Sequence, residues 1–103
     1  MKFRLILFTF FILHFTLYSY GQYDPSRINK KAVETYNHAL EQAQGNNYEM
    51  AIASLNKAIQ LDPNYIEAYL SLAGVYGQLK NYDQSASWYE KAFALDSNYS
   101  IAW

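Results

Sequence analysis

The sequence predicts an all-α protein in which antiparallel helix pairs stack into an α-solenoid. Two observations predict this fold class. When the chain is shifted against itself by 34 residues it aligns without a gap, and ten of the 34 aligned positions are identical. Within each unit, apolar residues recur at three- and four-residue steps, which is the spacing of one face of an α-helix. A fixed period of this length is typical of repeat folds, in which each unit buries its apolar face against the next.

Two complete units and the start of a third are expected after a lead-in. The lead-in covers 22–31, the first unit 32–65 and the second 66–99, while 100–103 restart the pattern with Trp103 at the position of Tyr69. Asp24 and Pro25 resemble an early helix start, because proline is tolerated in the first turn. Repeat stacks need about three units and a polar cap. We therefore expect a truncated piece of a longer array, or self-association that covers the open C-terminal end.

Each unit is predicted to contain two helices. In the second unit, the first helix has one apolar stripe, and Asn81 can cap the helix that follows it. That placement puts Ala86, Tyr89, Ala92, Phe93 and Leu95 on the inner side of the second helix. In the first unit, the turn Gly45-Asn46-Asn47 separates the helices, and Asp62-Pro63-Asn64 ends the second one, because proline cannot continue a helix.

These residues resemble the tetratricopeptide repeat, whose pattern is a large aromatic, Leu, a small residue and Tyr, followed by Ala, an aromatic or Leu, Ala and Pro. The second unit matches the first half of the pattern, and the first unit matches its second half. Thr35, His38 and Gln42 depart from the first half in the first unit, and Ser85 and Ser97 depart from the second half in the second unit. The residues that we expect to pack the repeats are Ala39, Ala51, Leu55, Ala58, Pro63, Tyr69, Leu72, Ala73, Tyr76, Tyr89 and Ala92.

The resemblance implies a concave groove, lined by the first helix of each unit, that binds a protein or peptide. The groove-facing positions that it implies are Val33, Tyr36, Asn37, Leu40, Ala43, Gln44, Glu67, Leu70, Ser71, Gly74, Gly77 and Gln78. Mid-helix glycine costs roughly 0.8–1 kcal/mol relative to alanine. Gly74 and Gly77 therefore indicate either close packing against the neighbouring repeat or a shallow floor that admits a ligand backbone.

The groove is expected to be neutral and partly aromatic. Tetratricopeptide domains that bind acidic chaperone tails use Lys and Asn on the groove wall, and here Tyr36, Leu40 and Ser71 occupy those places. A carboxylate clamp is therefore not expected. An extended or helical apolar peptide suits the groove better.

The N-terminal segment 1–21 has the pattern of a secretory signal peptide. Lys2 and Arg4 precede an apolar run from Leu5 to Tyr18, and Ser19 and Gly21 supply small residues before a cleavage site after Gly21. The run is shorter than the about 20 residues of a spanning helix. The expectation is an exported protein, periplasmic or secreted, and the alternative is an uncleaved membrane anchor.

No catalytic or cofactor-binding pattern is present in the sequence. The chain has no cysteine, and its residues show no phosphate-binding glycine loop, metal-spaced cluster or nucleophile elbow. His38 is interpreted as a packed or half-buried histidine, with Glu34 one turn before it. A net charge of -1 gives no basic excess for nucleic acid. The sequence therefore predicts no enzyme, no cofactor, no metal and no nucleic-acid partner.

Two functions remain open at this stage. The first is an exported scaffold that mediates protein–protein interaction through the groove. The alternative is the extracytoplasmic sensor or ligand-binding region of a larger membrane signalling protein.

Overall fold

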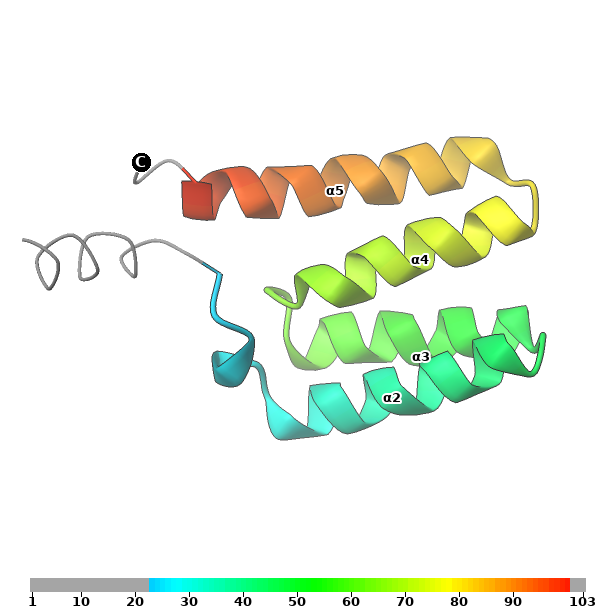
Figure 1. The fold of residues 1–103 in the computed structure, drawn as a ribbon, viewed down its shortest axis with the longest axis horizontal. Helices are drawn as coiled ribbons and strands as arrows, with labels where there is room; N and C mark the ends of the chain where they lie inside the picture. Colours follow the sequence, from blue (N-terminus) through cyan, green and yellow to red (C-terminus); the bar gives the residue numbers. More distant parts are fainter. Residues whose placement is uncertain (1–22, 101–103) are drawn as a thin grey trace, which may run out of the picture.

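The computed structural model describes residues 23–100, and the side chains of residues 23–97. They form a short 3₁₀ helix, η1 (Pro25–Arg27), and four α-helices: α2 (Lys30–Gln44), α3 (Tyr48–Leu61), α4 (Ile66–Gln78) and α5 (Tyr82–Ser100). Within this range there is no strand. The chain runs back and forth, so α2 and α4 point in one direction and α3 and α5 in the other (Figure 1). Each helix contacts the next one in sequence. The predicted all-α stack of helix pairs is confirmed.

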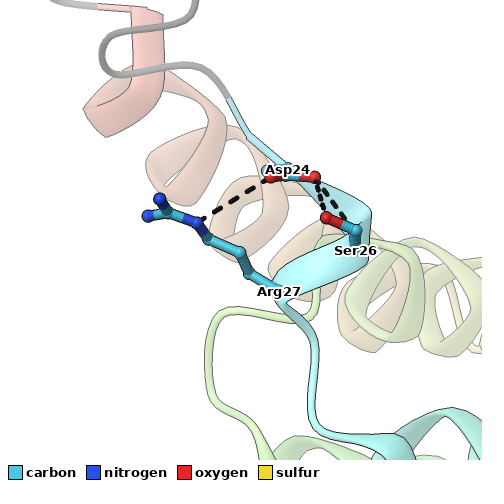
Figure 2. Close-up of polar contacts among 3 residues, drawn as sticks. All are labelled: Asp24, Ser26 and Arg27. Atoms are coloured by element: carbon cyan, nitrogen blue, oxygen red, sulfur yellow. Dashed lines mark hydrogen bonds and ion pairs between the residues drawn. The ribbon is translucent and has the colours of Figure 1, made fainter.

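The lead-in is one 3₁₀ turn and not the start of an α-helix. Asp24 caps this turn, because its Oδ1 accepts from the Ser26 amide at 3.0 Å and from the Ser26 hydroxyl at 2.7 Å. Arg27 lies 3.8 Å from the same carboxylate (Figure 2). The bond from the Ser26 hydroxyl, and then that from its amide, lower the pKa of Asp24. The first α-helix begins at Lys30.

Asn29 caps α2 and joins it to the turn between α3 and α4. Its Oδ1 accepts from the amides of Lys31 and Ala32 at 2.8 and 3.2 Å, which satisfies two of the four N–H groups that a helix start leaves unpaired. Its own amide donates to Asp62 Oδ2 at 2.9 Å. This bond connects the end of the lead-in to the turn between α3 and α4.

The two turns that join the helices of a pair have the same backbone. Asn46 (φ 63°) and Lys80 (φ 61°) are the two non-glycine residues with positive φ in the described part of the chain, and they stand 34 residues apart. After α2, the amide of Asn47 donates to Gln42 O and that of Asn46 to Ala43 O. These two bonds form a Schellman motif. After α4, the amides of Asn81 and Lys80 donate in the same way to Tyr76 and Gly77.

Small residues let the helices approach closely in the core. The least exposed side chains, each with 1% or less of their surface accessible, are Ala32, Ala39, Ala51, Leu55, Ala58, Ala68, Leu72 and Ala73. Leu55 and Leu72 are the largest fully buried side chains. Tyr23, Tyr36, Tyr48, Tyr76 and Trp88 pack around this core while half-exposed. The alanines set the spacing of the helices and the aromatic rings fill the margins.

The orientation of α5 differs from the prediction. Ser85 and Ala92 are buried and Trp88 packs against the core, whereas Tyr89 and Phe93 are 42% and 66% exposed. Ala86 is also exposed. The predicted inner side was therefore wrong at Ala86, Tyr89 and Phe93, and right at Ala92.

The physical reason is that the second helix of each unit has two apolar stripes. In α3 one stripe contains Ala51 and Ala58, and the other contains Leu55, and both are buried because α2 and α4 each contact α3. In α5 the stripe containing Ser85 and Ala92 is buried, and α4 is the helix that contacts α5. The stripe of Tyr82, Ala86, Tyr89 and Phe93 stays exposed because no other described helix packs there.

Two further predicted positions are exposed. Pro63 ends α3 as predicted but does not pack between repeats; its carbonyl oxygen accepts from the Tyr69 hydroxyl at 2.8 Å. His38 was expected to be packed, yet 66% of its side chain is accessible. No described helix covers that side of α2, so the ring lies in solvent, 3.8 Å from Glu41 and not against Glu34.

The prediction of a signal peptide falls on residues 1–21, which lie outside the described residues. Among the helices between residues 23 and 100, none combines the length and apolar character needed to cross a membrane.

Candidate protein-binding face

The twelve predicted groove positions come from α2 and α4, and we call the surface that they form the α2–α4 face. The two helices run in the same direction (Figure 1). Side chains also bridge them. The Tyr36 hydroxyl lies 3.0 Å from Ser71 Oγ, within hydrogen-bond distance. The rings of Tyr36 and Tyr65 also meet, with centroids 4.9 Å apart and a tilt of 49°. These contacts fix the register of α2 and α4 along the face.

The twelve positions differ in accessibility. Five are exposed: Asn37, Gln44, Leu70, Gly74 and Gln78. Seven are half-buried: Val33, Tyr36, Leu40, Ala43, Glu67, Ser71 and Gly77. Val33, Tyr36 and Ala43 also pack against the core, so they support the face as well as lining it.

Gly77 lies close to α5. A Cβ at this position would meet Ser85 Oγ at 3.6 Å, which is an ordinary van der Waals contact with α5. Residue 77 stands one helical turn after Ala73, whose carbonyl accepts from the Ser85 hydroxyl at 2.7 Å. Gly77 therefore borders the seam between α4 and α5, and its assignment to the groove stays a prediction.

Gly74 is the open position on the face. A Cβ there would have no atom within 4 Å, so close helix packing does not explain this glycine. Leu70, one turn earlier on α4, is 43% exposed. Residues four apart lie above one another on a helix. Leu70 and Gly74 together give the face an accessible apolar patch.

Glu67 has a partner that sequence reasoning missed. The Tyr23 hydroxyl donates to Glu67 Oε2 at 2.5 Å, across 44 residues of sequence. Burial is the main cause that raises the pKa of Tyr23, and the hydrogen bond to Glu67 raises it further. Burial also raises the pKa of Tyr65 to about 12, with contributions from Tyr36 and then Glu67. No sequence signal linked Tyr23 to the second unit, because the lead-in has no counterpart in the repeat.

Other polar groups lie on the α4–α5 seam. The Nζ of Lys91 stands 4.0 Å from the ring centroid of Trp88, a cation–π distance. The Trp88 Nε1 is buried and has no hydrogen-bond partner among the described residues. The ring of Tyr69 packs against Trp88 at a centroid distance of 5.8 Å. Over residues 23–97, no three His, Asp or Glu side chains gather in a way that could hold a metal ion.

Comparison with protein families finds two matches. A model described as TPR repeat matches residues 41–80, and a model described as tetratricopeptide repeat matches residues 66–99. Together they cover residues 41–99, from the end of α2 through most of α5. The range 32–40, where Thr35 and His38 depart from the repeat pattern, lies outside both matches. No curated protein matches the chain.

Proposed function

Because residues 41–99 carry tetratricopeptide repeats, we propose that this chain is an exported scaffold that binds an apolar segment of a partner protein on its α2–α4 face. Tetratricopeptide repeats generally mediate protein–protein interaction, and proteins built from them are typically scaffolds without catalytic activity.

The observation that carries the proposal is the open patch at Leu70 and Gly74. Leu70, with 43% of its surface accessible, stands one turn from Gly74, where an added Cβ would meet nothing within 4 Å beyond the backbone of its own helix. Half-buried Leu40 belongs to the α2 side of the α2–α4 face. The side chains of Asn37 on α2 and Gln78 on α4 are exposed on the same face. An apolar side chain of a partner would cover the leucines, and the amides could bond to its backbone.

The binding surface is tested with the chain from Gln22 onward and a displayed library of random dodecapeptides. We expect the chain to select peptides that carry a common apolar residue, and Leu70→Asp to abolish their binding. Met50→Asp is the matched control, since Met50 is 58% exposed but lies on α3. Equal loss in both variants, or no peptide selected by a folded chain, would contradict the proposal.

Export is supported by the sequence of residues 1–21 and is tested separately. A full-length chain expressed in bacteria should appear in the periplasm or the medium with Gln22 as its first residue. N-terminal sequencing of the purified protein checks this. A product that stays in the cytoplasm with Met1 or Lys2 at its start would contradict export.

A further inference from the structure

Glu67 is the one predicted face position that carries a charge. It is half-buried, and Tyr23 is its hydrogen-bond partner. Among residues 23–97, the ion pairs are Arg27 with Asp24 and His38 with Glu41, so no cation of the described chain neutralises Glu67. Removing a carboxylate from water is costly unless it is paired. The α2–α4 face therefore contains a negative charge, and no cation among the described residues pairs with it.

Repeat packing does not require this carboxylate. The equivalent residue in the first unit is Val33, which packs against the same core without any charge. A carboxylate in the first turn is favoured by the helix dipole. Glu49 has that position in α3 and is exposed to solvent, whereas Glu67 is bordered by Tyr23 and Tyr65.

The tyrosines around Glu67 suit a cation. Tyr23 donates to one carboxylate oxygen, and Tyr65 packs against Tyr36, which contacts Ser71 one turn beyond Glu67. Phenol rings attract cations through their negative faces, and the effect grows as water is excluded. A lysine or arginine placed here would meet the Glu67 carboxylate beside half-buried tyrosines.

We infer that the partner segment carries a lysine or arginine as well as an apolar residue, and that Glu67 binds its cationic group while the apolar residue covers Leu70 and Gly74. This inference rests on the proposed function, because it requires that the α2–α4 face is the binding surface. Glu67, Leu70, Ser71 and Gly74 stand at three- and four-residue steps on α4, so the charge and the apolar patch lie along one line.

The same dodecapeptide library tests this inference. We expect the wild-type chain to enrich peptides with a basic residue at a constant distance from the apolar one. Glu67→Gln keeps an oxygen that accepts from Tyr23 but removes the charge. This variant should bind the selected peptides with roughly tenfold lower affinity. That loss lies between the effects of breaking an exposed and a buried ion pair. Glu49→Gln removes an exposed first-turn charge and should leave their affinity unchanged.

A second variant separates binding from positioning. Tyr23→Phe removes the hydrogen bond and leaves the carboxylate, so the preference for basic peptides should persist. Both variants could lower the affinity for basic and neutral peptides equally. In that case Glu67 serves only to position the lead-in through Tyr23, and the inference is wrong. Selection of apolar peptides without basic residues would also overturn it, but would leave the proposed function standing. If Leu70→Asp still binds the selected peptides, the proposed function itself is contradicted.

Discussion

At the scale of single residues, the 34-residue period supplies pairs of positions with the same role and different surroundings. Leu55 and Tyr89 are equivalent, yet Leu55 is 1% exposed and Tyr89 is 42% exposed. The difference comes from α4, which covers the stripe of α3 that contains Leu55. The position in the repeat therefore does not determine burial; the next helix does.

Truncating these two residues should have unequal effects. Leu55→Ala removes a fully buried side chain and should lower the free energy of unfolding by about 2–5 kcal/mol. Tyr89→Ala removes a half-covered ring and should cost much less. Urea unfolding followed by circular dichroism measures both values. Equal losses would show that the exposed stripe of α5 is covered in solution.

Gly74 allows a prediction with the opposite sign. Gly74→Ala should raise the free energy of unfolding by about 0.8–1 kcal/mol, because alanine is the better helix former and the site has room for a methyl group. Thermal unfolding checks this. The same change at Gly77 places a methyl group 3.6 Å from Ser85 Oγ and serves as the comparison. A loss of stability at Gly74 would mean that another part of the chain packs over it.

At the scale of elements, the turns after α2 and α4 share one backbone conformation although their sequences differ. The turn after α2 is Gly45-Asn46-Asn47 and the turn after α4 is Leu79-Lys80-Asn81. Both turns contain a residue of left-handed conformation at the same place. Asparagine tolerates this conformation, whereas lysine does so at a cost. The turn after α4 is therefore kept by its packing and its bonds, and not by its local preference.

Replacing Lys80 should therefore stabilise the second helix pair. Lys80→Gly removes the Cβ that makes positive φ unfavourable, and should raise the free energy of unfolding by up to about 1 kcal/mol. Lys80→Ala keeps the Cβ and is the matched control, with no gain expected. Chemical unfolding of the three proteins in parallel decides the matter, and a gain in Lys80→Ala as large as in Lys80→Gly would contradict the explanation.

The sequence predicted the positions of the helices better than it predicted which of their faces are packed against other parts of the chain. The period, the cap at Asn81 and the stop at Asp62-Pro63 were enough to place the helix pairs, and Gln84 N does donate to Asn81 Oδ1 at 3.3 Å. The outward side of α5 was missed because both of its stripes contain residues suited to packing. The bond between Tyr23 and Glu67 was missed because it joins the lead-in to a helix 44 residues away.

At the scale of the whole molecule, three buried or half-buried tyrosines join elements that are distant in sequence. Tyr23 ties the lead-in to α4, Tyr65 meets Tyr36 on α2, and the Tyr69 hydroxyl donates to the turn after α3. Burial is the main cause that raises the pKa of each of these three tyrosines. The folded chain therefore keeps them protonated at a pH where the unfolded chain ionises them.

The fold should consequently be sensitive to alkali. The raised pKa of Tyr65 contributes stability that is complete below its usual pKa of 10.0 and is lost as pH rises toward about 12. The urea midpoint should fall across that interval and recover when the pH is lowered. Tyr65→Phe should make the fall shallower, while Tyr82→Phe, at a position 67% exposed, should not change it. An unchanged slope in Tyr65→Phe would contradict this assignment.

The packing of Trp88 between Tyr69 and Lys91 gives the molecule an intrinsic optical reporter. The sequence contains two tryptophans, so in a Trp103→Phe chain the indole emission comes from Trp88 alone. Because the Trp88 Nε1 is buried on the seam between α4 and α5, separation of α5 would bring water to the indole and shift its fluorescence to longer wavelength. Tyrosine and peptide signals come from all helices. Comparing the two kinds of spectrum during unfolding would therefore show whether the second helix pair opens before the first.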